Sequence, residues 1–331
     1  MKNWTVITGG AGYIGSHIAA AIKERDTDSV LIIDPLSKKR PNATEYCDTF
    51  ADEDFSSQLV HQTIMTLKPT TVIHCAEDIN ESLSVSDPLT VWENNAIKTV
   101  ALLKTCSFAK VKNFLFMSSA SVYPGGKVPH SESDKTWPMN CSARNKLMIE
   151  QMLKDCYYSH GLNSMSFRLP IVSGSNLEKN LGPLPSTNNV IHNLLSKILI
   201  GQPFEVYGND FPTSDGTALR NFIHVKDVVE AVLMSLNWLK TNNGCHTLNL
   251  SSDINLTVEQ LVKSVERIIE REIDYLYAGR EPGKPSVLTL DNSTIKSLFN
   301  WHPRYSIDDI VQSTWTWYQT GTYAELSGLL T

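Results

Sequence analysis

Three glycines near the amino terminus have the neighbours and the spacing of a phosphate-binding turn. Gly9, Gly12 and Gly15 directly follow an apolar run and open a stretch with helical periodicity. In such a turn the first glycine permits a tight bend, the second lets the backbone approach a pyrophosphate, and the third permits close packing of the helix on the strand. The turn residues Tyr13 and Ile14 are further candidate contacts, and the amino end of the helix that follows offers amide hydrogens and the positive end of its dipole to phosphates. The pattern indicates a dinucleotide-binding turn; an ordinary turn between a strand and a helix is the alternative.

Asp34 indicates which dinucleotide this turn would bind. It ends the second apolar run, Val30–Ile33, 19 residues after the last of the three glycines. A carboxylate there can accept hydrogen bonds from both hydroxyls of an adenosine ribose and repels a 2′-phosphate, which favours NAD over NADP. Basic residues at 38–40 keep NADP as the alternative. A short third strand at Tyr46–Cys47 would end at Asp48, whose carboxylate could reach the adenine or lie at the surface.

Neither metal nor disulfide chemistry is indicated. The nine histidines show no HxxxH or HExxH spacing, so we expect no metal site. Six cysteines are scattered without a CxxC pair, as expected of small buried side chains in a reducing compartment.

The composition narrows the class of protein. Over 331 residues, 41% are hydrophobic and 19% charged, enough for a full core in two lobes. The net charge of −6 disfavours a protein that coats nucleic-acid phosphates. No apolar stretch approaches 18 residues, and the first strand begins within a few residues of Met1. We therefore expect a cytoplasmic protein without a membrane span or signal peptide.

Short apolar runs alternate with helical periodicity in the first half of the chain. Strands that are apolar throughout and separated by helices indicate a parallel sheet covered on both faces. This predicts an α/β fold with a Rossmann-type, doubly wound parallel sheet. The predicted strands are Thr5–Thr8, Val30–Ile33, Thr71–Cys75, Phe114–Met117 and Ser164–Arg168, and the predicted helices are Gly15–Arg25, Asp54–Leu67, Pro88–Phe108 and Cys141–Tyr158.

The second half of the chain has shorter apolar runs and more irregular composition than the first. This predicts a smaller α/β substrate-binding lobe. Gly174–Asn189 is rich in Asn, Gly, Pro and Ser and indicates a long irregular loop. We expect residues 1–170, with 218–248, to form the NAD-binding domain, and 171–217 with 249–331 to form the second lobe. The elements expected after the loop are helices at Val190–Leu199, Asp227–Leu239 and Thr257–Glu270 and strands at Phe204–Tyr207 and Phe222–Val225.

Several blocks of the chain, in the same order, resemble UDP-galactose 4-epimerases (UDP-glucose 4-epimerases) of the extended short-chain dehydrogenase/reductase family. They are Thr-Gly-Gly-Ala-Gly-Tyr-Ile-Gly-Ser-His at 8–17, Asn-Phe-Leu-Phe-Met-Ser-Ser-Ala-Ser-Val-Tyr at 113–123, Lys-Leu-Met-Ile-Glu-Gln at 146–151, the segment 207–227, and Trp-Thr-Trp at 315–317. The resemblance implies an isomerase of carbohydrate metabolism that uses NAD and binds a nucleotide sugar, a UDP-hexose.

The resemblance also implies roles for particular residues. In that family a tyrosine, kept ionisable by a lysine four residues later, takes the proton of the sugar 4-hydroxyl while hydride passes from C4 to NAD, and a serine hydrogen-bonds the reacting oxygen. Here the serine is Ser119 and the lysine is Lys146, which also holds the cofactor ribose. Further cofactor contacts are implied for Cys75, Ala76 and Asn95, and substrate contacts for Ser119, Asn189 and Arg220.

Four positions depart from the family pattern. Ser142 stands in the tyrosine position, and its aliphatic hydroxyl is a poor base on a short side chain. Glu77-Asp78-Ile79 replaces a Gly-x-Lys whose lysine touches the cofactor, Ile171 replaces an asparagine, and Glu281 replaces an arginine that grips the diphosphate. We expect epimerase activity that is severely weakened, since losing a placed base costs roughly 10²–10⁴ in rate. The alternative is an NAD-binding pseudoenzyme that acts as a sensor, a scaffold or an inactive dimer partner.

Family dimers pair through two long helices, which here are Pro88–Phe108 and Cys141–Tyr158. The resemblance therefore implies a homodimer with a four-helix interface. Trp92, Leu102, Leu147 and Met148 are candidate contacts, although periodicity would equally make them core residues.

Overall fold

The computed structural model describes residues 3–36, 38, 40–77, 86–126 and 129–328. They divide into two compact units. The first holds the described parts of 1–122 together with 140–168 and 229–248, and the second holds those of 123–139 together with 169–228 and 249–328. The units differ from the domains expected from the sequence at three segments, since the described residues of 123–139, 169–170 and 218–228 group with the second unit.

One seven-stranded sheet organises the first unit. Its strands are β1 (Trp4–Thr8), β2 (Ser29–Ile33), β3 (Thr49–Ala51), β4 (Thr71–His74), β5 (Asn113–Ser119), β6 (Asn163–Leu169) and β10 (Cys245–Asn249). They lie in the order β10-β6-β5-β4-β1-β2-β3. β1 runs parallel to β2 and β4, with Val6 opposite Leu31 and Val72. The predicted parallel, doubly wound sheet is confirmed.

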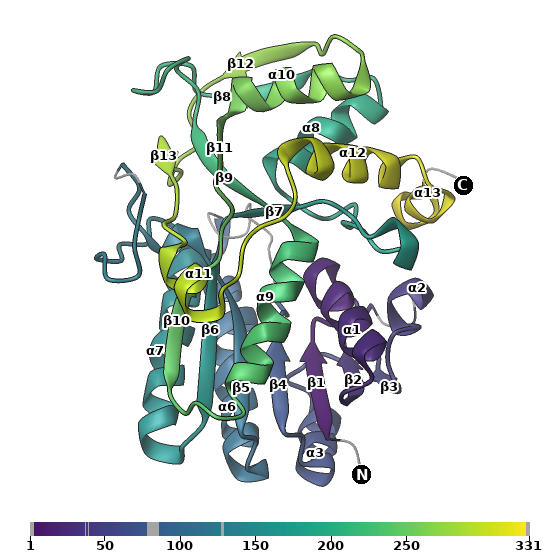
Figure 1. Ribbon diagram of the computed structural model, residues 1–331, viewed down its shortest axis with the longest axis vertical. Coiled ribbons are helices and arrows are strands. Elements are labelled where there is room, and N and C mark those ends of the chain that lie inside the picture. The colour runs from purple at the N-terminus through teal and green to yellow at the C-terminus, as the bar shows by residue number, and fades with distance from the viewer. Residues whose placement is uncertain (1–2, 37, 39, 78–85, 127–128, 329–331) are drawn as a thin grey trace. The chain divides into compact units, whose positions relative to one another are not determined.

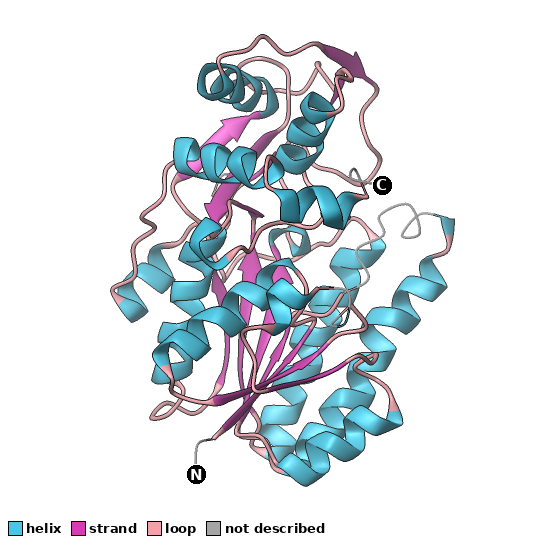
Figure 2. Cartoon of the chain, turned by 90° about the vertical axis from the view of Figure 1, so that its right-hand side faces the viewer, coloured by secondary structure: helices cyan, strands magenta, loops and turns pink. Residues whose placement is uncertain are grey.

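Helices cover both faces of this sheet. They are α1 (Tyr13–Arg25), α3 (Gln58–Leu67), α5 (Pro88–Trp92), α6 (Lys98–Ala109), α7 (Cys141–His160) and α9 (Val225–Trp238). α1 and α9 lie on one face, and α3, α6 and α7 pack side by side on the other (Figure 1). Figure 2 shows the strands between these two layers of helices. The helix predicted at 88–108 is one element in three parts, because a π-helical turn, η2 (Glu93–Ile97), joins α5 to α6.

The core of the first unit follows from the apolar strands. Val6, Leu31, Val72 and Phe114 contribute from four neighbouring strands and are at most 2% exposed. Burying a side chain of this size contributes about 1.5–3 kcal/mol. Leu102 of α6 is completely buried in the same cluster. It is therefore a core residue, and the expected dimer contact at this position is wrong.

The third strand of the sheet does not lie where the sequence predicts it. Residues 41–44 form a short helix, α2 (Pro41–Thr44), which begins with a proline at a position where helices accept it. The strand follows at Thr49–Ala51. Asp48 therefore precedes β3 instead of ending it.

The second unit is smaller, and its described strands form two small sheets. β9 (Leu219–His224) pairs with β7 (Ile171–Ser173), β11 (Ile254–Thr257) and β13 (Val287–Leu288), and β8 (Phe204–Tyr207) pairs with β12 (Tyr275–Ala278). Its helices are α8 (Val190–Leu199), α10 (Val258–Ile269), α11 (Ser293–Phe299), α12 (Ile307–Tyr318) and α13 (Gly321–Ser327). α8, α10 and α12 share an apolar cluster that includes Leu194, Leu261 and Ile310. The helices and strands predicted for this half are confirmed within a few residues.

The segment 174–189 contains a single 3-10 turn, η4 (Leu177–Lys179), and is otherwise irregular, as predicted. A second 3-10 turn, η3 (Ala120–Val122), follows β5 in the first unit.

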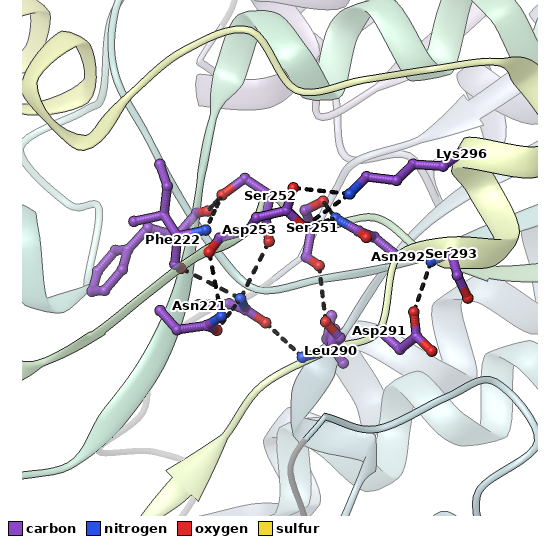
Figure 3. Close-up of polar contacts among 12 residues, drawn as sticks. Asn221, Phe222, Ser251, Ser252, Asp253, Leu290, Asp291, Asn292, Ser293 and Lys296 are labelled. Atoms are coloured by element: carbon purple, nitrogen blue, oxygen red, sulfur yellow. Dashed lines mark hydrogen bonds and ion pairs between the residues drawn. The ribbon is translucent and has the colours of Figure 1, made fainter. Parts of the chain in front are cut away.

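A cluster of polar side chains replaces regular pairing where β9, the turn before β11 and the segment before α11 meet (Figure 3). The Asn221 carboxamide accepts from the amide of Leu290 at 2.5 Å and donates to Asn255 at 2.5 Å. Asn292 donates to the carbonyl of Ser251 at 2.8 Å. Two of these bonds, those to the Leu290 amide and the Ser251 carbonyl, satisfy buried backbone groups that lie outside the strands.

No helix among the described residues has the length and apolar character needed to cross a bilayer.

Candidate functional site

The glycine turn has the geometry that its sequence predicts. Gly9 has φ +67°, a conformation that disfavours other residues, and a Cβ there would lie 2.5 Å from the amide nitrogen of Ala76. A Cβ on Gly15 would collide with the carbonyl oxygen of Gly9. Gly12 caps α1 without a side-chain hydrogen bond to the helix amides. The amino end of α1, with Tyr13 and Ile14 in its first turn, is thus presented by backbone alone, as a bound pyrophosphate requires.

Asp34 lies against this turn. Its carboxylate accepts from the amide of Ala11 at 3.1 Å and from the amide of Leu36 at 2.9 Å. Burial raises the pKa of Asp34 above its ordinary value, and these bonds and the Arg40 cation oppose that rise. The Arg40 guanidinium is itself buried and donates to the carbonyl oxygen of Ala11. Burial lowers the pKa of Arg40 to about 10, and the charge of Asp34 opposes this shift.

Asp48 does not lie at this edge of the sheet. Its carboxylate binds Lys23 Nζ at 2.8 Å and accepts from the amide of Val30 at 2.7 Å. Val30 is near the start of β2, whereas Asp34 follows its end, so the expected contact of Asp48 with an adenine is wrong. Asp52, which follows β3 directly and pairs with Lys38 at 3.2 Å, stands at the carboxyl edge instead. Sequence analysis missed Asp52 because it placed the strand too early.

A small cavity opens beyond β4 and β5 within the first unit. It is lined by His74, Ala76, Glu77, Asn95, Phe116, Asn145, Lys146 and Ile149. Asn95 lies in the π-helical turn, where one extra residue leaves the helix pattern locally broken. The Ala96 amide of that turn donates to Asn145 Oδ1 at 3.2 Å, so a side chain of α7 fixes the turn. Such turns are frequent at functional sites.

The first two residues after β4, Cys75 and Ala76, offer backbone instead of reactive groups. The Cys75 amide continues the sheet by donating to the carbonyl of Thr8 at 2.9 Å, and Ala76 follows it into the cavity. Burial raises the pKa of the Cys75 thiol to about 12, so it is not a thiolate at neutral pH. His74 bonds both neighbouring threonines, Thr8 at 2.6 Å and Thr99 at 3.1 Å, and burial lowers its pKa to about 3.

Three side chains meet where the sequence predicts the reacting centre. The Glu77 carboxylate pairs with Lys146 Nζ at 2.7 Å and accepts from Ser142 Oγ at 3.0 Å. Lys146 also donates to the carbonyl of Met117 at 2.9 Å, two residues before Ser119 on β5. Glu77 therefore connects Ser142 with Lys146, which lies one helical turn later on α7. Asp78 and Ile79, the other expected departures in this segment, lie outside the described residues.

Ser119 ends β5 and takes part in a local turn. Its hydroxyl oxygen accepts from the amide of Ser121 at 3.1 Å and from Ser121 Oγ at 2.8 Å. Its own proton remains a donor for another oxygen. In the second unit, Tyr123 is buried, and its hydroxyl donates to Asn249 Oδ1 at 2.9 Å. Tyr123 thus has a packing role and does not offer a phenol as a base.

A buried ion pair positions α7 on the sheet. Glu150 of α7 accepts from Arg168 of β6 at 3.1 Å and 2.7 Å, and Ser118 of β5 donates to the same carboxylate at 2.5 Å. All three residues are at most 6% exposed. Two-point Arg–carboxylate contacts fix orientation as well as distance. The helix that carries Ser142 and Lys146 is therefore held at one rotation and height against β5.

Two of the three expected substrate residues, Asn189 and Arg220, belong to the second unit. Asn189 caps α8: its Oδ1 accepts from the amides of Ile191 and His192, each at 3.1 Å. Arg220 donates to the carbonyls of Leu219 at 2.8 Å and Pro285 at 2.7 Å, and burial lowers its pKa to about 10. Ile171 begins β7 opposite Phe222.

Glu281 and Lys284, in the segment that follows β12, pair with each other at 2.9 Å. The negative charge of Glu281 opposes the fall in the pKa of Arg220. No group of three His, Cys, Asp or Glu able to hold a metal ion occurs among the residues that the structure describes.

Comparison with known proteins identifies the family. The model of the "NAD dependent epimerase/dehydratase family" matches residues 5–251. The chain belongs to this family, and within it to the UDP-galactose 4-epimerase group. UDP-glucose 4-epimerase of Azospirillum brasilense is 31% identical over 317 residues, covering 94% of this chain and 91% of the relative. UDP-glucose 4-epimerase of Rhizobium meliloti (strain 1021) is 30% identical over 320 residues, covering 96% and 97%.

Solved structures agree with this assignment. A UDP-glucose 4-epimerase from Stenotrophomonas maltophila, with bound NAD and formylated UDP-arabinopyranose, superposes with a TM-score of 0.90 at 26% identity, over 97% of this chain and 99% of that one. A UDP-glucose 4-epimerase from Brucella ovis in complex with NAD gives a TM-score of 0.87 at 28% identity, over 95% and 98%. The similarity therefore extends over both units.

Proposed function

We propose that this chain interconverts UDP-hexoses that differ at C4, with NAD as the bound cofactor, and that it does so more slowly than its tyrosine-bearing relatives. The observation that carries the proposal is Lys146, which reaches from α7 to the carbonyl of Met117 beside Ser119. Both residues that polarise the sugar hydroxyl in the family are thus present at adjoining elements of one unit. The relatives named as UDP-glucose 4-epimerases support the reaction type.

The first unit supplies a site that fits NAD. The backbone of the glycine turn faces the pyrophosphate, and Asp34 accepts the adenosine ribose hydroxyls. Asp52 is placed to accept from the adenine amino group. Backbone at Cys75 and Ala76, the Asn95 amide and Lys146 surround the nicotinamide end. NAD, when bound, takes up and returns the hydride of the sugar C4; the residues of this chain bind, orient and move protons.

We assign nucleotide-sugar contacts to Ser119 in the first unit and to Asn189 and Arg220 in the second. Arg220 already donates to chain carbonyls, so it would offer its remaining donors to a diphosphate. Glu281 stands in the position of the family's second diphosphate-binding arginine. It pairs with Lys284, so the charges of these two side chains sum to zero. Binding of the diphosphate is therefore expected to be weaker than in relatives with two arginines.

The rate is limited by the residue at 142. A phenol next to a lysine is ionisable, whereas a serine hydroxyl is not at neutral pH. Losing a placed general base costs roughly 10²–10⁴ in rate.

Two measurements test the proposal. Heat-denatured protein should release NAD or NADH in stoichiometric amount, measured by absorbance and fluorescence. UDP-galactose should be converted to UDP-glucose, measured by chromatography. Release of no dinucleotide, or no product after prolonged incubation at high protein concentration, would refute the epimerase proposal.

A second function is favoured by one observation. The Lys146 ammonium is paired with Glu77 at 2.7 Å, an arrangement that ties up the lysine a catalytic phenol would need. An NAD-binding pseudoenzyme, acting as a sensor, a scaffold or an inactive dimer partner, would show stoichiometric NAD with no turnover. The two measurements above separate the alternatives.

We further propose a homodimer through α5, α6 and α7. Leu89, Ile97 and Phe108 expose 77%, 62% and 74% of their surface on the first helix, and Met148 exposes 46% on α7. Apolar side chains exposed in such a group mark an interaction surface. Ile97→Glu should give monomers in sedimentation velocity, whereas Leu276→Glu, on the exposed side of β12, should leave the dimer intact. Equal sedimentation of Ile97→Glu and the unsubstituted chain would contradict this interface.

A further inference from the structure

We propose that Glu77 is the terminal proton acceptor of the reaction and that Ser142 passes the proton to it. The proposal rests on the epimerase function proposed above and names the groups that do the work of the missing phenol. It is carried by one geometric relationship: the hydroxyl at the tyrosine position donates to a carboxylate, Glu77 Oε1, at 3.0 Å.

The direction of this hydrogen bond allows Ser142 to accept a proton and to pass its own proton on to Glu77. Because its single hydroxyl proton points to Glu77, the lone pairs of Oγ remain available to accept a proton from a substrate hydroxyl. A serine by itself is too weak a base to hold that proton. A serine that gives up its own proton to a carboxylate while it accepts the substrate proton does not have to act as the final base. Ser142 is half-buried, and its partner Glu77 lines the cavity of the first unit.

Glu77 is held from both sides. Its second oxygen, Oε2, pairs with Lys146 Nζ at 2.7 Å, and Lys146 is in turn held by the carbonyl of Met117 at 2.9 Å. The side chains of Glu77 and Lys146 are only 19% and 12% exposed, so a carboxylate there needs a charged partner. The Lys146 ammonium also lies over the ring of Phe116, with Nζ 5.3 Å from the ring centroid, and this cation–π contact further restricts its position. Lys146 thus holds the Glu77 carboxylate in place and aimed at Ser142.

The proton and electron balance is closed. In the oxidising direction the C4–H bond breaks, its electron pair leaves as hydride to the oxidised nicotinamide, and the C4–O bond becomes a carbonyl. The 4-hydroxyl proton passes to Ser142 Oγ as the serine proton passes to Glu77 Oε1. The return step reverses both transfers on the opposite face of the sugar. Nothing is consumed, and Glu77 is a carboxylate again after each cycle.

The proposal also explains why two departures from the family pattern occur together. Glu77 stands in the position of the family's glycine in Gly-x-Lys, and Ser142 stands in the position of its tyrosine. In this chain the side chain at 77 reaches the hydroxyl at 142, so the two positions form one contact. A carboxylate is a weaker base than a phenolate, so this relay agrees with slow turnover.

The deciding variant is Glu77→Gln, which keeps an oxygen for the Ser142 hydroxyl but cannot hold the proton. We expect kcat for UDP-galactose to fall by about 10²–10⁴ with KM and NAD content little changed. Glu77→Asp, which keeps the charge, should retain part of the activity, and added formate should partly restore Glu77→Ala.

Asp54 provides a matched control. It accepts from Ser56 Oγ at 2.5 Å and from Lys98 Nζ at 3.0 Å, the same pair of donor types, away from the cavity of the first unit. Asp54→Asn should leave kcat unchanged.

A second readout does not depend on turnover. In infrared difference spectra of the NAD-loaded protein, UDP-galactose should produce a protonated carboxyl band that is absent from Glu77→Gln. If the unsubstituted chain turns over and Glu77→Gln does so equally well, or if the band persists in Glu77→Gln, the relay is refuted and the epimerase function stands. If the unsubstituted chain shows neither product nor band, both proposals are refuted.

Discussion

The hydroxyl of Ser142 and the carboxylate of Glu77 face each other at 3.0 Å, at two positions where the sequence predicts departures from the pattern of the family. Taken one at a time, each change removes something: a phenol at 142 and an unobstructed backbone at 77. Placed together, they form a hydrogen-bonded pair that Lys146 completes at 2.7 Å. The two positions must therefore be changed together to recover the family's arrangement.

The first prediction concerns that pair of changes. The Glu77 side chain occupies the space next to Ser142, so Ser142→Tyr alone should give little gain, whereas Ser142→Tyr with Glu77→Gly should raise kcat by about 10-fold or more. Residues in contact are not additive, and the double-mutant cycle measures this directly. Ser159→Tyr, exposed near the end of the same helix, is the control and should change nothing. A double variant that binds UDP but turns over no faster than the original chain would contradict the prediction.

The second prediction separates two acids at opposite edges of the sheet. Asp34→Asn should weaken NAD binding by about 10- to 100-fold, since hydrogen bonds to a charged group contribute about 1.5–3 kcal/mol. Asp48→Asn should leave NAD affinity unchanged, because Asp48 binds Lys23 and the Val30 amide near the start of β2. Calorimetric titration of NAD into cofactor-free protein measures both. Equal losses in the two variants would show that the carboxyl edge is not the cofactor edge.

The third prediction concerns the support of α7. Glu150→Gln leaves the Arg168 cation buried beside a neutral partner, which should lower the free energy of unfolding by about 3–5 kcal/mol. Lys263→Gln breaks an exposed pair with Glu266 and should have no measurable effect on the same denaturant curve. An unchanged denaturation midpoint for Glu150→Gln would mean that the buried pair does not hold the helix.

The fourth prediction follows from the buried histidine beside β1. Burial lowers the pKa of His74 to about 3, whereas an unfolded histidine titrates near 6.5. Between these values the unfolded chain binds one more proton, so the free energy of unfolding falls as the pH drops from about 6.5 towards 3 and is independent of this group at higher pH. Each such group contributes at most about 1.4 kcal/mol per pH unit.

Urea unfolding at pH 7, 6 and 5 should therefore show a smaller pH dependence in His74→Gln than in the unsubstituted chain. His192 of the second unit, whose pKa burial also lowers to about 3, should behave in the same way. Parallel curves for His74→Gln and the unsubstituted chain would contradict the assigned protonation state.

The fold was predictable from the sequence because its strands are apolar without interruption and its first turn requires glycine at defined positions. The early strand at Tyr46–Cys47 was wrong, since Pro41 starts a helical turn and the β-forming Thr49 and Phe50 lie further on. That shift placed Asp48 at the wrong edge and hid Asp52. Local pattern does not fix where a three-residue strand begins.

The candidate site was only partly predictable. Residues that belong to a motif within one element, such as Gly9 or Lys146, could be predicted from that motif and its spacing. The π-helical turn around Asn95 depends on a bond from Ala96 to Asn145 of another helix, which no local pattern indicates. The sequence showed an acid at 77 and a serine at 142, but their contact joins residues 65 positions apart and is visible only in three dimensions.

The most direct measurement uses UDP-galactose carrying deuterium at C4, incubated with the NAD-loaded chain and followed by NMR. We expect slow formation of UDP-glucose that keeps its deuterium at C4, because the hydride is taken and returned within one site. UDP-glucose that has lost the label, or no UDP-glucose from a protein that carries NAD and binds UDP-galactose, would contradict the account.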